Sequence, residues 1–326
     1  MKQIHDRNIS LLSLFIQKIP HNSIIHTGRL LGLAGYVLDL RHRRIVLRNL
    51  KFAYPQWSSR KVRTMARRIF QNMGITMLEI CQLSFLPKKN ILAKACIKGE
   101  DNLVNAINSE KGIIFISAHI GNWELSLLHC SYYIQSGILL VASRIRLKML
   151  DRWIQRLRSS SGNILINKKG ALPSMVKALR KGEALGLLVD QSTKRSEGVN
   201  VDFFGHKVTA TPVVAMLAIR YNCIVLPAFC VREKDGTYTL IYKKPLRVKK
   251  TDDLKSDITS YTQVMTDMIE NMVREYPDQW FWFHKRWKRY YPELYPEAIK
   301  RRDRRRKKRF AKQNQTKPGK INSEDF

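Results

Sequence analysis

The pattern of apolar and polar residues changes once along the chain, near residues 111–112. Before this point apolar residues recur at helical spacing, most clearly over residues 60–82. One stripe of this segment holds Val62, Met65, Ile69, Met73, Met77 and Ile80. Pro55 followed by Ser58 predicts a break and an N-cap just before this helix. We therefore expect a helical layer in the first third of the chain.

After this point short apolar runs of strand length alternate with helical patterns. The runs occupy residues 113–116, 138–141, 164–166, 185–189 and 224–229, and the helical patterns occupy residues 123–133, 147–158, 172–181 and 212–221. Strands that are apolar throughout are buried on both faces, as in a parallel sheet covered by helices. An alternating run at 238–242 follows an Asp235-Gly236 turn and predicts an antiparallel strand, and a last helix is expected at 258–276. The predicted fold class is α/β, with a mostly parallel sheet flanked by helices.

The most apolar segments, residues 9–19 and 24–40, are both too short or too interrupted to span a bilayer, which requires about 18 to 20 apolar residues. Arginines at 41, 43 and 44 follow the second segment at once. We expect a helix that lies in a lipid interface with its basic end among anionic head groups, and an amphipathic core helix is the alternative. The expected organisation is a helical membrane-associating region over residues 1–97, an α/β core over 98–292 and a basic disordered tail over 293–326.

Composition changes this picture mainly through charge. The chain carries 59 Lys and Arg against 26 Asp and Glu, a formal net charge of +33. Residues 300–326 contain 12 basic and 3 acidic residues, so +9 of this charge lies in the expected tail and +24 in the folded part. A field of this sign requires anionic partners, which are nucleic acid, anionic lipid, or acidic proteins and substrates.

Cysteine and glycine patterns exclude several classes of protein. The five cysteines are an odd number, lie far apart and form no CxxC pair, so we expect buried thiols in a reducing compartment and neither a disulfide framework nor a zinc site. No secretory signal is apparent at the N-terminus. Phosphate-binding and dinucleotide-binding glycine motifs are absent, which disfavours kinases and dehydrogenases. We expect no metal and no cofactor.

Candidate chemistry is concentrated in the segment IIFISAHIGNWE at residues 113–124. His119 follows an apolar strand, at the sheet edge where ligand sites form in open α/β folds. Chain reversal through Gly121 is expected to bring the Glu124 carboxylate back to the imidazole, which gives a base oriented by an acid. Such a pair suits deprotonation of a hydroxyl that attacks an activated acyl carbon, with backbone N–H groups after Gly121 stabilising the oxyanion. The alternative is a structural histidine and a glutamate that favours the helix dipole.

The segment from His119 to Glu124 resembles the HxxxxD/E motif of the glycerolipid (lysophospholipid) acyltransferase superfamily. Gly-Asn-Trp within it makes the segment similar to the late acyltransferases of lipid A biosynthesis, the bacterial lauroyl and myristoyl transferases. Further matching segments extend the resemblance over residues 10–292; they include Asn49-Leu50, Asn72-Met73-Gly74, Asp190-Gln191, residues 201–205 and 209–212, and Pro277-Asp278-Gln279-Trp280.

The resemblance implies roles for further residues. It implies that Arg158 binds a substrate phosphate or closes the site, and a helix C-terminal charge is the alternative. It implies a site role for Asp190, which follows the strand at 185–189 and would orient the substrate or a neighbouring base; a cap is the alternative. Gln191 and Asn122 are expected substrate-binding residues on the same ground. Residues 209–212 predict a helix N-terminus with threonine caps.

Aromatic residues alternate with cations over residues 277–289, which include Trp280, Phe281, Trp282 and Phe283. This composition is typical of anchoring at a lipid interface, although platforms for single-stranded nucleic acid use the same residue types. The resemblance favours lipid. His284, which follows this run, is expected to be structural.

The resemblance thus implies an acyltransferase at the cytoplasmic face of the inner membrane. It would transfer a fatty acyl chain from an acyl carrier protein thioester to a hydroxyl of a phosphorylated lipid A precursor, with His119 as general base assisted by Glu124. The expected partners are the carrier protein, the glycolipid and an anionic membrane surface, with no nucleic acid. Alternatives are an acyltransferase for another glycolipid or glycerophospholipid, a basic protein that binds nucleic acid, and an inactive membrane scaffold of the same fold.

Overall fold

The computed structural model describes residues 18–84, 86–134, 137–142, 148–168, 170–247 and 250–299. Most of the apolar segment at residues 9–19 lies outside the described residues, and so do residues 300–326 of the expected tail. Residues 293–299 of that tail are described, and Tyr295 among them is buried.

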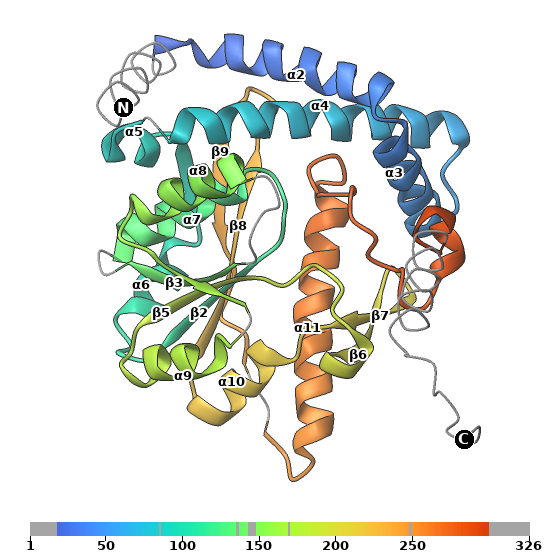
Figure 1. The fold of residues 1–326 in the computed structure, drawn as a ribbon. Coiled ribbons are helices and arrows are strands. Elements are labelled where there is room, and N and C mark those ends of the chain that lie inside the picture. Colours follow the sequence, from blue (N-terminus) through green and yellow to red (C-terminus); the bar gives the residue numbers. More distant parts are fainter. Residues whose placement is uncertain are drawn as a thin grey trace, which may run out of the picture.

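A seven-stranded sheet forms the centre of the fold, with the strand order β1-β9-β8-β2-β5-β3-β4 (Figure 1). Its strands are β1 (Ala95–Lys98), β2 (Ile113–Ser117), β3 (Ile138–Ala142), β4 (Ile164–Asn167), β5 (Ala184–Leu188), β8 (Ile224–Arg232) and β9 (Tyr238–Tyr242). All neighbouring strands are parallel except β8 and β9. The predicted mostly parallel sheet, including its antiparallel strand, is confirmed. The sequence pattern missed β1, a four-residue strand whose side chains are alternately exposed.

Helices cover both faces of the sheet. They are α5 (Lys88–Leu92), α6 (Glu100–Ile107), α7 (Trp123–Ile134), α8 (Lys148–Ser159), α9 (Leu172–Arg180), α10 (Val213–Tyr221) and α11 (Leu254–Glu275). Successive residues of β2 enter different cores: Ile113 and Phe115 pack with α7, whereas Ile114 and Ile116 pack with residues of α9, α10 and α11. The sheet is therefore buried on both faces, as the continuous apolar runs predict.

Three helices form the predicted N-terminal layer: α2 (His21–Leu38), α3 (Leu40–Ala53) and α4 (Ser59–Leu83). Ser58 caps α4 by accepting from the Lys61 N–H at 3.2 Å, as expected. The apolar segment at 24–40 does not form one helix, because Asp39 ends α2 and caps α3. In Figure 1, α2 and α4 run side by side along the outer edge of the molecule. Within the described part of the chain, no helix is long and apolar enough to cross a membrane.

Glycines allow α2 and α4 to approach backbone to backbone. A Cβ at Gly32 would lie 2.2 Å from the Phe70 carbonyl oxygen, and a Cβ at Gly74 would lie 2.2 Å from the Gly28 carbonyl oxygen. Side chains at these positions would therefore force the two helices apart. This close contact turns the opposite face of α2 outward, with its leucines exposed.

The aromatic segment after α11 is part of the core. Trp280, Trp282 and Trp287 are at most 1% exposed. The prediction that these rings anchor the protein at a lipid interface is wrong, because they fill the space between the sheet edge and a small hairpin, β6 (Val199–Phe203) and β7 (His206–Ala210). Trp280 and Trp287 pack against Phe203 of this hairpin. The expected threonine caps are also wrong, because Pro212 is the N-cap of α10 and it has no side-chain cap bond.

All five cysteines are free thiols, as expected from their odd number and wide spacing. Cys130, Cys223 and Cys230 are buried as expected. Cys96 is exposed and Cys81 is partly exposed, so the prediction that all five are buried is wrong for these two.

Candidate functional site

His119 lies in a tight turn between β2 and α7. Two backbone hydrogen bonds hold this turn against the segment after α11: the Gly121 N–H donates to the Gln279 carbonyl at 3.0 Å, and the Phe281 N–H donates to the His119 carbonyl at 2.9 Å. Gly121 has φ of 55°, and a Cβ there would lie 1.9 Å from the Cys230 carbonyl oxygen, so the turn requires glycine. The backbone that carries His119 is therefore fixed on two sides.

The carboxylate that contacts the imidazole comes from the end of the neighbouring strand. β5 pairs in parallel with β2, so their carboxyl ends meet at one edge of the sheet. Asp190 Oδ1 lies 2.8 Å from His119 Nδ1, and Oδ2 accepts from the His119 backbone N–H at 3.0 Å and from Trp280 Nε1–H at 2.9 Å. Asp190 is only 1% exposed. The prediction that Asp190 shares a sheet edge with His119 is confirmed.

Electrostatics make these two groups an ion pair when the imidazole is protonated. Burial by itself would lower the pKa of His119, but the charge of Asp190 and its hydrogen bond outweigh burial and raise that pKa above its ordinary value. Burial would raise the pKa of Asp190, but the charge of His119 and its hydrogen bonds hold that pKa well below its usual range. Because the ionised Asp190 carboxylate accepts a hydrogen bond from Nδ1–H, Nε2 of the neutral imidazole is the basic atom.

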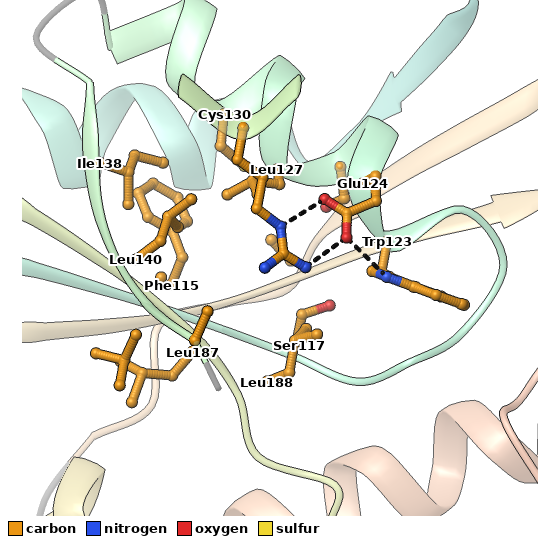
Figure 2. Close-up of a pocket in the computed structure, with 16 residues that line it drawn as sticks. Phe115, Ser117, Trp123, Glu124, Leu127, Cys130, Ile138, Leu140, Leu187 and Leu188 are labelled. Atoms are coloured by element: carbon orange, nitrogen blue, oxygen red, sulfur yellow. Dashed lines mark hydrogen bonds and ion pairs between the residues drawn. The ribbon is translucent and has the colours of Figure 1, made fainter. Parts of the chain in front are cut away.

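Glu124 is buried in the first turn of α7, but its carboxylate faces Arg158 of α8 (Figure 2). Arg158 Nε donates to Oε2 at 2.9 Å, and Arg158 Nη2 donates to Oε1 at 2.5 Å. Oε1 also accepts from Trp123 Nε1–H at 3.1 Å. The expectation that Glu124 orients the imidazole is therefore wrong: α7 directs the carboxylate to a guanidinium, and the structure gives the orienting contact to Asp190. Glu124 acts on His119 only through its charge, which raises the pKa of the imidazole to a lesser extent than Asp190 does.

The phosphate-binding role expected for Arg158 stays a prediction. Its side chain is 19% exposed and occupied by Glu124. Gln191 is exposed beside Asp190. Asn122 is buried: its Oδ1 accepts from the Leu125 N–H at 3.1 Å and so caps α7. The substrate contacts expected of Gln191 and Asn122 also stay predictions.

A buried ion pair supports the turn from the side of α4. Arg232 Nη2 donates to Glu79 Oε2 at 2.6 Å and to Thr76 Oγ1 at 2.9 Å. Thr76 Oγ1 donates in turn to the Gly121 carbonyl at 3.2 Å, and Asn122 Nδ2 donates to Glu79 Oε2 at 3.4 Å. The helical layer is thus connected directly to the turn that carries His119.

A cavity of about 80 Å³ lies between α7, α8 and the sheet (Figure 2). Its lining is mostly apolar, from Phe115, Leu127, Cys130, Ile138, Leu140, Val141, Ala142, Gly186, Leu187, Leu188 and Ala228, with Ser117, Trp123, Glu124, Ser126 and Arg158 among its polar members. One water-sized group needs about 10–15 Å³, so the cavity holds several such groups. A chain of methylenes ending in a polar group matches this lining.

Trp123 links the cavity to His119. Its ring lines the cavity, and its centroid lies 5.3 Å from that of the His119 imidazole in an edge-to-face arrangement. No role was expected for Trp123 beyond its place in the motif, and Trp280, which was expected at a lipid interface, donates to Asp190. Trp123 could have been found from its position just after the turn that carries His119. Trp280 could not, because its segment, residues 279–281, reaches this turn only through backbone pairing in the folded chain.

His284 lies on the other side of Asp190. Its Nδ1–H donates to the Phe281 carbonyl at 2.9 Å, and burial lowers its pKa to about 4. A neutral, buried ring held by the backbone fits the expected structural role.

Comparisons with known proteins find a matching family model and several similar proteins. The model of a family described as bacterial lipid A biosynthesis acyltransferase matches residues 9–289. The chain is 27% identical over 285 residues to a lipid A biosynthesis lauroyltransferase of Escherichia coli, covering 86% of this chain and 90% of that protein. It is 24% identical to a lipid A biosynthesis palmitoleoyltransferase of the same organism, covering 86% and 89%. A phosphatidylinositol mannoside acyltransferase of Mycolicibacterium smegmatis is 26% identical over 57% of this chain and 60% of its own length.

Proposed function

Because this chain belongs to the bacterial lipid A biosynthesis acyltransferase family, we propose that it transfers a fatty acyl chain. The donor is an acyl carrier protein thioester, and the acceptor is a hydroxyl of a phosphorylated lipid A precursor. The observation that carries the mechanism is the 2.8 Å contact between His119 Nδ1 and a buried Asp190 at one end of the sheet.

The proposed reaction needs only one base. Nε2 of neutral His119 takes the proton of the acceptor hydroxyl as its oxygen attacks the thioester carbonyl carbon. A C–O bond forms, the carbonyl becomes a tetrahedral oxyanion, and its collapse breaks the C–S bond. The imidazolium, stabilised by Asp190, returns the proton to the leaving thiolate. The products are an ester and a free thiol, and no acyl-enzyme forms.

The cavity beside Trp123 is the proposed site of the acyl chain. Its apolar lining excludes water from a hydrocarbon, and burial of each methylene contributes about 0.8 kcal/mol. Glu124, one of its polar members, accepts a hydrogen bond from Trp123, the residue that contacts His119. This arrangement would direct the acyl carbonyl toward the base and the hydrocarbon away from it.

A direct test offers the purified protein a panel of acyl carrier proteins with different acyl chains and a tetra-acylated lipid A precursor. We expect the mass of the precursor to increase by one acyl group. The match to mannoside acyltransferases makes a mannosylated phospholipid the informative second acceptor. Transfer only to that acceptor would assign the protein to the other substrate class, and transfer to neither would refute the proposed activity.

The pH dependence follows from the raised pKa of His119. The base must be neutral in the free enzyme, so activity is lost as pH falls through the folded-state pKa of the imidazole. Because this pKa lies above the ordinary value of a histidine, kcat/KM should begin to fall, as the pH is lowered, at a higher pH than an unperturbed imidazole would give. Asp190→Asn should move this acid limb to lower pH, since it removes the charge that raises the pKa. An acid limb that is unmoved by the substitution would contradict the pairing.

We further propose that the protein binds the cytoplasmic face of the inner membrane through α2. The face of this helix that is turned away from α4 exposes Leu30, Leu31, Val37 and Leu38, by 69%, 53%, 57% and 80%. Exposed Arg41 and Arg44 follow directly. An apolar helix face next to cations is suited to an anionic lipid interface.

We expect the protein to sediment with vesicles containing anionic phospholipid at low salt and to be partly released at high salt, because salt screens the basic residues. A Leu31→Asp, Leu38→Asp double variant should lose most of this binding. Met216→Asp is the matched control, since Met216 is 43% exposed on α10 at the opposite end of the molecule (Figure 1). Equal binding by the two variants would contradict the assignment of α2.

A further inference from the structure

Ser117 carries a buried hydroxyl that the site described above does not use. It is the last residue of β2, and within the described residues its Oγ has no hydrogen-bond partner. A buried hydroxyl without a partner destabilises the folded state, and it is retained where a ligand or an ordered water forms the missing hydrogen bond. Ser126, another serine that lines the cavity, differs in that its hydroxyl bonds to Cys130.

Ser117 lies along the chain between Phe115, in the apolar lining of the cavity, and His119. Side chains two residues apart in a strand share a face, so Phe115 and Ser117 both line the cavity, and His119 follows at the strand end against Trp123. In Figure 2 the Ser117 hydroxyl points toward the side of the cavity where Trp123 and Glu124 lie. His119 follows two residues later, just beyond the end of β2, and its ring packs against Trp123, which lines the same cavity.

Three of the backbone donors in and after the turn that carries His119 are already in use. The Gly121 N–H donates to the Gln279 carbonyl, and the Asn122 N–H donates to the Cys230 carbonyl at 3.2 Å. The Leu125 N–H donates to the Asn122 side chain. These three N–H groups are therefore not available to an oxyanion, and a side-chain hydroxyl at the cavity can supply a donor.

We propose that Ser117 is that donor: its Oγ–H donates a hydrogen bond to the carbonyl oxygen of the bound acyl thioester and stabilises the tetrahedral oxyanion. This assignment rests on the proposed acyl transfer. The hydroxyl keeps its proton throughout, while the acceptor proton passes to His119 Nε2 and then to the thiolate. The bond strengthens as the carbonyl oxygen gains charge, so it accelerates the chemical step more than it tightens binding.

The test compares the steady-state kinetics of Ser117→Ala with those of the wild-type enzyme. We expect kcat to fall by about 10²-fold or more with little change in KM for the acyl thioester, because the lost interaction belongs to the transition state. Ser117→Cys keeps the volume of the side chain but donates weakly, and it should lose a comparable share of kcat. Thermal unfolding should occur at the wild-type temperature or above in Ser117→Ala, since a partnerless hydroxyl is removed.

Ser131→Ala is the matched control. Ser131 is a buried serine of α7 outside the cavity, and its hydroxyl donates to the Leu127 carbonyl at 2.7 Å. Its kcat should stay close to that of the wild type. Wild-type kcat in both Ser117 variants would overturn the assignment of Ser117 and leave the proposed function standing. Absence of transfer by the wild-type enzyme itself would instead refute the proposed function.

Discussion

His119→Ala is expected to lower the kcat of acyl transfer by about 10²- to 10⁴-fold, the usual cost of losing a general base. The acceptor hydroxyl is a weak nucleophile unless its proton is removed as it attacks, and His119 is the only histidine that the structure places against Asp190 by hydrogen bonds among the described residues. The side chain of His119 is 20% exposed, so the fold should be retained when it is removed. Initial rates of product formation, measured together with circular dichroism, check this prediction.

His129→Ala is the control for this experiment. His129 is also a buried histidine near the site, on α7, but its ring contacts Tyr242 and takes no part in the proposed reaction. It should lose stability rather than catalysis. If folded His119→Ala retained a rate within about tenfold of the wild type, the general-base assignment would be wrong.

Asp190→Asn should produce the second large effect, a loss of kcat on the order of 10³- to 10⁴-fold. The carboxylate holds a proton on Nδ1 and so leaves Nε2 free to act as base. An amide that donates to Nδ1 would place the proton on Nε2, where it blocks catalysis, and it would remove the charge that stabilises the imidazolium. Kinetics together with the pH profile separate this effect from a general loss of structure.

Asp257→Asn is the matched control, because Asp257 is a buried aspartate that accepts two hydrogen bonds from Thr251 at the start of α11, away from the site. Its kcat should be close to that of the wild type. Glu124→Gln adds a contrast: it leaves the contact between His119 and Asp190 intact but weakens a buried pair with Arg158. If Asp190→Asn lost less kcat than Glu124→Gln, then Glu124 and not Asp190 would be the carboxylate that assists His119.

The fold was largely predictable from local patterns. Continuous apolar runs such as 113–116 identify strands buried on both faces, and Ser58 identifies the start of α4. The turn Asp235-Gly236 identifies the antiparallel β9. These signals are local, because periodicity, caps and turn residues act within a few residues of the chain. The strand β1 was missed because Cys96 and Lys98 are exposed, so its four residues form no continuous apolar run.

The partners within the site were not predictable in the same way. Sequence spacing brings Glu124 close to His119, but the direction of each side chain depends on which helix lies opposite. α8 places Arg158 against Glu124, and β5 places Asp190 against His119. The tryptophans after α11 mislead for the same reason: a run of aromatic and basic residues has the composition of a lipid interface, whereas Trp280 is buried and donates to Asp190. Tertiary contacts decide both cases.

The most direct test of the central claim, that His119 and Asp190 act as one unit in acyl transfer, is a double-mutant cycle. Initial rates are measured by mass spectrometry for the wild type, His119→Ala, Asp190→Ala and the double variant, with an acyl carrier protein thioester and a tetra-acylated precursor. The wild type should add one acyl chain, and the double variant should be hardly slower than His119→Ala, because Asp190 acts through the imidazole. Losses that multiply in the double variant, or a wild-type enzyme that leaves the precursor unchanged, would contradict this account.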